Sequence, residues 1–189
     1  MLNSVKTKIL GYFIQIGLGE QGDLEVYEYG FILLLKKLFH IVTILAMGWL
    51  ANELVNVAIF LLVYICIREY SGGYHSKSSL GCYICTVVII SLAIAFFKLE
   101  LFHPWIVLLI LVICGVLIWF FSPQEAENKP LEFGEIQRYR KRTRIYLITF
   151  EIIALILHIL LPTLEKGIVC ALLIQSIMLL ISIVKMVNN

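Results

Sequence analysis

Histidine and cysteine share only one polar stretch of this chain, at His75 and Cys82. The stretch covers residues 68–82 and reads REYSGGYHSKSSLGC. A cysteine attacks a carbonyl group as its thiolate, and a nearby imidazole can take the thiol proton and hold the thiolate as an ion pair. The residue types therefore allow a histidine–cysteine dyad between two long apolar runs.

The spacing of seven residues sets a condition on the backbone between the two side chains. In one straight helix they would lie about 10 Å apart along the axis, which is too far for proton transfer. Gly72, Gly73 and Gly81 allow backbone conformations that other residues resist. We therefore expect a dyad only if residues 72–81 do not form one continuous helix.

The serines before residue 80 predict where the next helix begins. Ser78 or Ser79 is a suitable N-cap, because a serine hydroxyl can accept a hydrogen bond from an N–H of the first turn. Cys82 would then lie in that first turn, where the partial positive charge of the helix N-terminus favours an anion.

Other roles for these residues stay open at this point. A histidine and a cysteine seven residues apart also occur by chance. Cys82 and Cys85 form a C-x-x-C pair, but both fall on one predicted helix, which disfavours a thioredoxin-like role. His75 and the two cysteines offer three metal ligands without an evident fourth, so we predict no metal and no cofactor. Three further cysteines are expected to pack as free thiols within apolar runs: Cys66, Cys114 and Cys170.

The composition indicates that these residues are carried by a membrane protein. Of 189 residues, 61% are hydrophobic, and the mean hydropathy is +0.96, well above a soluble domain. A spanning helix needs about 20 apolar residues, and its backbone bonds must be internal. We therefore predict an all-α, polytopic membrane protein. Its six apolar segments cover approximately residues 31–50, 54–67, 80–97, 104–121, 145–161 and 168–187.

The N-terminal part of the chain differs from the apolar remainder. Residues 4–19 mix apolar side chains with lysines and a glutamine, which is typical of an amphipathic helix on the membrane surface. We therefore divide the chain into an interfacial segment, residues 1–30, and a six-helix membrane domain, residues 31–189. The second apolar segment, 54–67, is short and spans only if it includes flanking residues.

The positions of lysine and arginine predict the orientation. With a cytoplasmic N-terminus, 13 of the 15 Lys and Arg residues fall inside, and only Lys98 and Lys166 fall outside. Both termini and the stretch at residues 68–82 are then predicted at the cytoplasmic face of the cell membrane.

The longest connection, residues 122–144, is predicted as a cytoplasmic loop whose second half is basic. Two readings of these cations stay open: contact with anionic lipid, or docking of an acidic peptide. Nucleic-acid binding is not expected, because no domain that reads nucleic acid accompanies the patch. The basic residues are Arg138, Arg140, Lys141, Arg142 and Arg144.

Three polar residues at or within apolar segments invite further roles. Glu151 is a candidate for substrate contact or helix pairing, since carboxylates are rare within spanning segments. His158 is expected to have a backbone or side-chain partner. Arg68 ends the second segment and is either a membrane-edge anchor or a residue that holds a carboxylate or carbonyl group.

The stretch at residues 68–82 resembles the signature of the accessory gene regulator B (AgrB) family. These proteins are membrane endopeptidases of quorum sensing in Gram-positive bacteria. Glu28-Tyr29-Gly30 and Glu127-Asn128-Lys129-Pro130-Leu131 resemble two further landmarks of the family. Six apolar segments and the chain length fit as well, so the resemblance covers nearly the whole chain.

The resemblance implies specific roles and a substrate. His75 matches the catalytic histidine, Cys82 matches the catalytic cysteine, and Arg68 and Gly73 match positions associated with activity. The substrate would be a precursor peptide of the AgrD type with an acidic C-terminal tail, which Arg138, Arg140 and Lys141 could hold. Cleavage through a thioester on Cys82 would lead to a cyclic thiolactone or lactone signal. A homodimer is also expected.

A different class of function stays possible on the residues alone. Six helices and Glu151 permit a small transporter or channel. Sparse charge within the segments and the lack of an evident pair of broken helices disfavour it.

Overall fold

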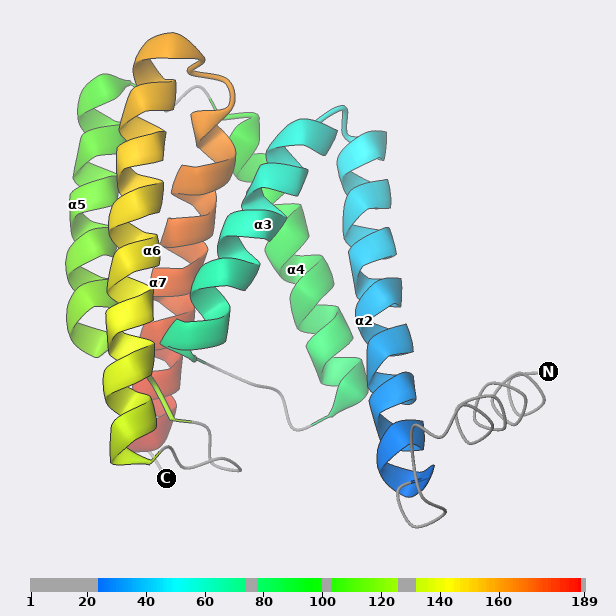
Figure 1. Cartoon of the computed structure of the whole chain (residues 1–189). Coiled ribbons are helices and arrows are strands. Elements are labelled where there is room, and N and C mark those ends of the chain that lie inside the picture. Colours follow the sequence, from blue (N-terminus) through cyan, green and yellow to red (C-terminus); the bar gives the residue numbers. More distant parts are fainter. Residues whose placement is uncertain (1–23, 74–77, 100–102, 126–131, 188–189) are drawn as a thin grey trace. The chain divides into compact units, whose positions relative to one another are not determined.

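Six α-helices make up the regular structure of the part of the chain that the computed structural model describes, residues 24–73, 78–99, 103–125 and 132–187 (Figure 1). Each helix is long and apolar enough to cross a membrane. The predicted all-α class with six spanning helices is therefore confirmed. The helices are α2 (Leu24–Leu50), α3 (Leu54–Ser71), α4 (Ser79–Phe97), α5 (Pro104–Phe121), α6 (Phe133–Leu160) and α7 (Glu165–Val187).

The chain divides into two compact units, residues 1–43 and 44–189. The first unit is described only from Leu24, as the N-terminal part of α2. Residues 24–30 belong to this helix, and the division of the chain at residue 30 stays a prediction. The surface helix predicted at residues 4–19 lies outside the described residues and stays a prediction, as does the cytoplasmic placement of both termini.

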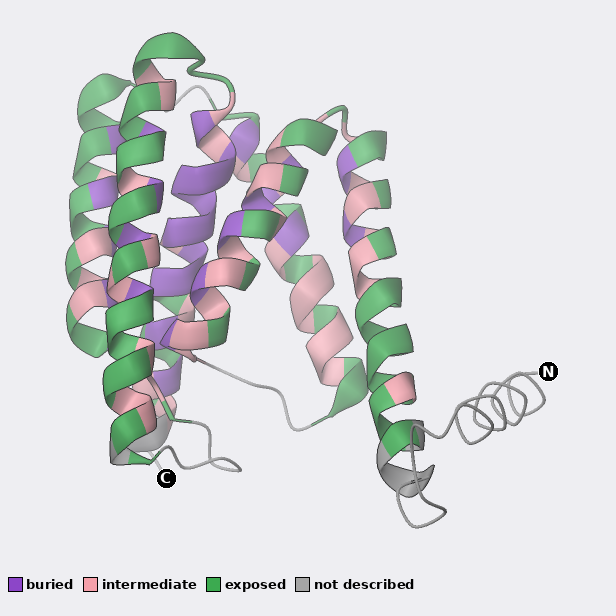
Figure 2. Ribbon diagram, in the orientation of Figure 1, coloured by how far each residue is buried: buried purple, intermediate pink, exposed green. Residues whose placement is uncertain are grey.

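Helix α7 lies at the centre of the second unit. It packs against α3, α4, α5 and α6, and 61% of its most apolar stretch is buried, against 17–28% for those four helices. Figure 2 shows the buried residues concentrated along α7. The apolar side chains of the outer helices point outward instead, as expected where lipid takes the place of water. The polar side chains of Glu165, Gln175 and Ser176 on α7 are therefore held inside the protein.

Small residues let the helix backbones approach each other, as is typical inside membranes. A Cβ atom at Gly167 of α7 would lie only 2.7 Å from the backbone oxygen of Asn56 on α3. Ala154 of α6 and Ala171 of α7 are fully buried. Close packing against α7 fixes the relative positions of α3 and α7, which carry the site described below.

Helices α3 and α6 extend into polar residues beyond the apolar segments that predicted them. Helix α3 includes the polar residues 68–71 and so reaches 18 residues, which resolves the shortness of that segment. Helix α6 begins at Phe133, so the basic half of the predicted loop 122–144 is helical, and that part of the prediction is wrong. The cause is a capping box, in which Glu132 and Glu135 each bond the other's backbone N–H and start the helix early.

Candidate active site at the end of helix α3

Helix α3 ends in two glycines with left-handed backbone conformations. Gly72 has a φ of 71° and Gly73 a φ of 122°, values that residues with a Cβ atom rarely adopt. The N–H of Gly72 closes the helix by donating to the carbonyl oxygen of Arg68 at 3.2 Å. The chain therefore turns sharply away from the helix axis two residues before His75.

The Arg68 side chain folds back onto this turn. Its Nη1 donates to the carbonyl oxygen of Gly72 at 3.0 Å. The same Nη1 atom occupies the space where a Cβ atom of residue 73 would lie, so any other side chain at Gly73 would displace the guanidinium group. Arg68 thus holds a carbonyl group, one of its two expected uses, and the carbonyl belongs to its own chain.

Two other elements hold the same turn. Nε2 of Gln175 on α7 donates to Oγ of Ser71 at 2.6 Å and to the carbonyl oxygen of Gly72 at 2.9 Å. The N–H of Gln124, which follows α5, donates to the carbonyl oxygen of Ser71 at 2.9 Å. Gln175 is a lone amide within the apolar segment 168–187, which is the sequence signal that could have identified it.

Cys82 lies where the serine pattern places it. Ser78 is the N-cap of α4, with extended backbone, and its Oγ accepts a hydrogen bond from the N–H of Gly81 at 2.9 Å. The N–H of Cys82 donates to the carbonyl oxygen of Ser78 at 3.0 Å. Cys82 is partly exposed, and its thiol is free. The prediction of Ser78 as a cap and of Cys82 in the first turn is confirmed.

The condition set by the spacing of the dyad is met by the described residues. Helix α3 stops at Ser71, Gly72 and Gly73 are left-handed, and Ser78 is extended. No single straight helix therefore runs through residues 72–81. His75 itself lies outside the described residues, so its pairing with Cys82 stays a prediction.

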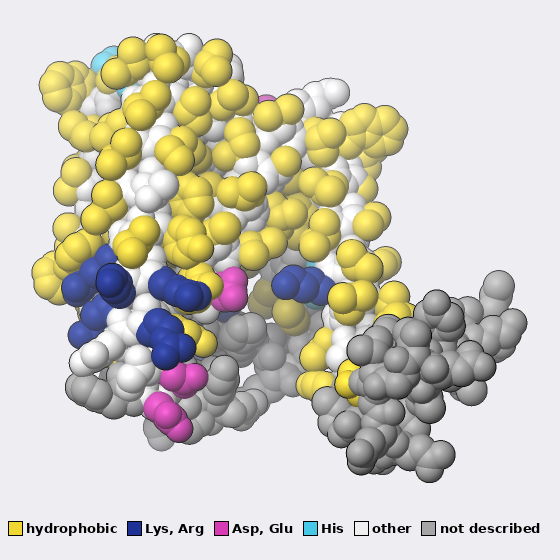
Figure 3. All heavy atoms as spheres, viewed as in Figure 1, with side chains coloured by type: hydrophobic (Ala, Val, Ile, Leu, Met, Phe, Trp, Pro, Cys, Tyr) yellow, Lys and Arg dark blue, Asp and Glu magenta, His cyan; other side chains and the backbone are white. Residues whose placement is uncertain are grey.

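The basic residues lie on the N-terminal half of α6. Arg138, Arg140 and Lys141 are exposed, and Figure 3 shows Lys and Arg side chains gathered at this end of the helix. Because these residues lie on a helix, the distances between them are fixed, whereas a loop would leave those distances variable. All three are therefore accessible at the start of α6.

Two other arginines of this stretch contact aromatic side chains. Nη1 of Arg142 donates to the hydroxyl of Tyr70 on α3 at 2.8 Å, and the ring of Tyr70 stacks on Tyr146 with centroids 5.6 Å apart. Arg144 lies 4.2 Å from the ring centroid of Trp119 on α5. Tyr70 directly precedes Ser71, so these contacts join the basic end of α6 to the glycine turn.

Two predicted polar residues of α6 have defined neighbours. Glu151 is half-buried, and a Cβ atom at Gly115 of α5 would meet its Oε1, which places the carboxylate against the neighbouring helix. Nδ1 of His158 lies 2.6 Å from Oε2 of the fully buried Glu165. The expectation that His158 has a partner is confirmed.

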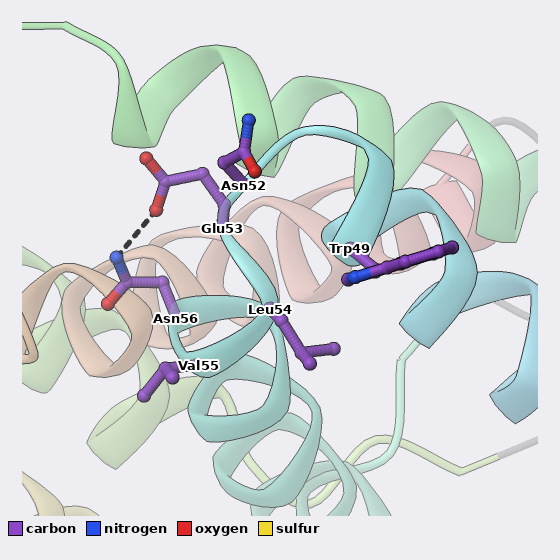
Figure 4. Close-up of a pocket in the computed structure, with 6 residues that line it drawn as sticks. All are labelled: Trp49, Asn52, Glu53, Leu54, Val55 and Asn56. Atoms are coloured by element: carbon purple, nitrogen blue, oxygen red, sulfur yellow. Dashed lines mark hydrogen bonds between the residues drawn. The ribbon is translucent and has the colours of Figure 1, made fainter.

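One open cavity lies at the other end of α3, about 27 Å from Ser71 by the length of an 18-residue helix. Its volume is about 250 Å³, and Nδ2 of Asn56 donates to Oε2 of Glu53 at 2.7 Å at its edge (Figure 4). This cavity is remote from Cys82. Its lining residues are Trp49, Asn52, Glu53, Leu54, Val55 and Asn56.

Within the described residues, no group of three or more His, Cys, Asp or Glu side chains could hold a metal ion. His75, which belongs to the set of ligands considered from the sequence, lies outside those residues. The described polar groups of the site are therefore the thiol of Cys82, the guanidinium group of Arg68, the side-chain amide of Gln175 and the backbone N–H of Gln124.

These features define a class: a multi-pass helical membrane protein with a polar turn fixed at one end of its central helices. The family model described as Accessory gene regulator B matches residues 6–179. The chain therefore belongs to the accessory gene regulator B family.

Curated relatives agree with this assignment. A putative AgrB-like protein of Clostridium perfringens is 30% identical over 147 residues, covering 72% of this chain and 67% of the relative. A putative AgrB-like protein of Halalkalibacterium halodurans is 29% identical over 85% of this chain and 77% of its own. The accessory gene regulator protein B of Staphylococcus aureus is 28% identical over 63% of this chain and 62% of its own. No solved structure matches the chain.

Proposed function

We propose that this protein is a membrane cysteine endopeptidase that removes the C-terminal tail of an AgrD-type precursor peptide and cyclises the remainder. The observation that carries the proposal is the stretch from Arg68 to Cys82, in a chain that belongs to the family. The position of Cys82 in the capped first turn of α4 supports it, because its thiol is partly exposed at the N-terminus of a helix.

The reaction divides into two acyl transfers. His75 takes the proton of the Cys82 thiol, and the thiolate attacks the scissile carbonyl of the precursor. The C–N bond breaks, and the tail leaves as an amine that takes the proton back from His75. The product of this step is a thioester between the peptide and Cys82.

Cyclisation then regenerates the enzyme. A thiol or hydroxyl inside the bound peptide loses its proton to His75 and attacks the thioester carbonyl. The bond to Cys82 breaks, its sulfur recovers a proton, and the peptide closes as a thiolactone or lactone. Exchange of one thioester for another is nearly neutral in free energy, so the site must exclude water to prevent hydrolysis. A position at the membrane boundary favours that exclusion.

The basic face of α6 gives the acidic tail a place to bind. Arg138, Arg140 and Lys141 are exposed there, and Arg142 on the same helix bonds Tyr70, one residue before Ser71. A tail held along this face would lie near the glycine turn. Binding there would bring the scissile carbonyl towards Cys82.

The test is co-expression of the enzyme with its precursor peptide, followed by mass spectrometry of the products. We expect Cys82→Ser and His75→Ala to leave the precursor uncleaved. Cys85→Ser is the matched control, because Cys85 lies one turn further along α4 and is equally half-buried. Cleavage that continues in Cys82→Ser or His75→Ala would exclude the proposal.

A second measurement separates cleavage from cyclisation. A precursor whose internal cysteine or serine is replaced by alanine cannot close the ring, so the peptide should accumulate on Cys82. The adduct should have the mass of the truncated peptide and should be released by hydroxylamine, which cleaves thioesters. If the truncated peptide is released as a linear acid without any adduct, the enzyme is a simple hydrolase.

The transporter hypothesis predicts a different outcome. It predicts that Glu151 lines a polar path across the membrane and that Cys82 is dispensable. Solute flux in proteoliposomes that persists in Cys82→Ala and is lost in Glu151→Gln would favour it over peptide processing.

A further inference from the structure

Gln175 is a fully buried amide in the middle of the central apolar helix. A polar side chain in such a place is costly unless its hydrogen bonds are made, and it commonly marks a function. Its Nε2 makes two hydrogen bonds, whereas its Oε1 has no partner among the described residues. The amide is thus used as a donor towards one place, the end of α3.

Both bonds from Gln175 go to the residues that lead into the glycine turn. Ser71 is fully buried and receives one bond on its hydroxyl, and the carbonyl oxygen of Gly72 receives the other. The same carbonyl accepts from Arg68, and the carbonyl of Ser71 accepts from Gln124. Arg68 and two elements distant in sequence, α7 and the residues that follow α5, therefore converge on two consecutive residues.

We propose that Gln175 is a positioning residue that fixes the backbone at Ser71–Gly72 and so sets where the chain enters the segment that carries His75. The part that concerns catalysis rests on the proposed peptidase function, whereas the fixed backbone does not. Gln175 touches neither Cys82 nor a substrate. It acts through the turn.

The conformational freedom of the turn explains why such a residue is needed. Glycine loses more backbone entropy on ordering than any other residue, and two consecutive glycines in left-handed conformations have no side chains to hold them. Arg68 approaches the turn from its own helix and moves with it. Gln175 approaches from α7, the helix that packs against α3, α4, α5 and α6. The bonds from α7 and from Gln124 tie the backbone of the turn itself to elements outside α3.

The decisive variant is Gln175→Met. Methionine has nearly the same length and shape but lacks both the donor and the unpartnered buried oxygen, so folding should be preserved. The matched control is Ser176→Ala. Ser176 is the next residue and is also buried, but its hydroxyl donates to the carbonyl oxygen of Leu172 in its own helix and lies against the thiol of Cys114 on α5.

The first readout is amide hydrogen exchange in lipid nanodiscs, which is independent of catalysis. In Gln175→Met we expect exchange at the N–H groups of Gly72 and Gln124 to accelerate at least about tenfold, with exchange in the middle of α7 unchanged. Ser176→Ala should leave both rates unchanged. Unaltered exchange in Gln175→Met, or equal acceleration in Ser176→Ala, would overturn the proposal.

The second readout is steady-state processing of the precursor peptide. A misplaced catalytic segment lowers kcat while binding of the peptide is retained, so we expect kcat to fall at least about tenfold and KM to stay within about twofold. The thermal midpoint in micelles should not fall. If kcat falls only in proportion to the loss of folded protein, Gln175 is merely structural and the proposal is wrong.

Two further results keep the inference separable from the proposed function. If the wild-type protein processes no peptide but exchange still accelerates in Gln175→Met, the fixed turn is supported and the peptidase function fails. If Gln175→Met does not accumulate, Ser71→Ala can be used in its place. It removes the hydroxyl oxygen that accepts one of the two hydrogen bonds from Gln175. Faster exchange at Gly72 in Ser71→Ala supports the proposal, and an unchanged rate contradicts it.

Discussion

Arg68 and Gly73 are two parts of one contact. The guanidinium group of Arg68 lies where a Cβ atom of residue 73 would be, and it donates to the carbonyl oxygen of Gly72. The resemblance to the family marked both positions without giving a reason. Their geometry supplies one, because glycine at residue 73 leaves room for the arginine and tolerates a φ of 122°.

Gly73→Ala tests this contact at the scale of a single residue. The added methyl group displaces the guanidinium and strains a left-handed backbone, which together cost about 1–3 kcal/mol. We expect processing of the precursor to fall at least about tenfold, as measured by the rate of tail release.

A double-mutant cycle provides the control for that prediction. If Gly73→Ala acts by displacing Arg68, the variant with both Gly73→Ala and Arg68→Ala should be no slower than Arg68→Ala alone. Additive losses would mean that the two residues act separately. Gly134→Ala should have no effect, because nothing lies within 4 Å of a Cβ atom there.

At the scale of elements, helix α6 changes the meaning of the basic run. Arg142 and Arg144 are engaged by Tyr70 and Trp119, and α6 thereby contacts the ends of α3 and α5. Arg138 and Lys141 are three residues apart on one helical face and are exposed. A helix presents these cations as a fixed row, which suits an extended acidic peptide better than a mobile loop would.

Charge reversal on this row should weaken binding of the acidic tail. In Arg138→Glu combined with Lys141→Glu we expect KM for the precursor to rise at least about fivefold, because attraction becomes repulsion. The KM of the wild type should also rise with salt, since these charges are exposed and screened. Both effects are measured by initial rates of cleavage in nanodiscs.

Lys98→Glu is the matched control for the charge reversal. Lys98 is also exposed, but it follows the C-terminal end of α4, whereas Cys82 lies near the N-terminal end of the same helix. We expect its KM to match that of the wild type. An equal increase of KM in Lys98→Glu would show that net charge matters and that the row on α6 does not.

At the scale of the whole molecule, alternation of the helices fixes which connections share a side of the membrane. With six spans, the α3–α4 and α5–α6 connections lie on one side, and the α2–α3, α4–α5 and α6–α7 connections lie on the other. The candidate active site and the basic start of α6 thus face the same compartment. The distribution of Lys and Arg predicts that this compartment is the cytoplasm.

Labelling of single cysteines checks this orientation. In intact cells, a membrane-impermeant maleimide should label Asn52→Cys, at the α2–α3 turn, and should not label Lys141→Cys until the membrane is opened. The parent protein without an added cysteine gives the background from the five native thiols. Labelling of Lys141→Cys from outside would invert the predicted topology.

The sequence by itself determined the class of fold, the six spanning segments, a serine cap for α4 at Ser78 or Ser79, and the stretch that carries His75 and Cys82. These features are local: apolar length, capping chemistry and family motifs are each read from neighbouring residues. The start of α6 was predicted too late, because the apolar segment begins only near residue 145, whereas the capping box between Glu132 and Glu135 starts the helix at Phe133.

Only the tertiary structure decided what holds the turn after α3. Gln175 and Ser71 lie 104 residues apart in the chain, and Gln124 comes from a third region, so no periodicity or motif links them. Their meeting depends on which faces of the helices pack against α7. That choice follows from the fit of small residues such as Gly167 and Ala171 across the whole membrane domain.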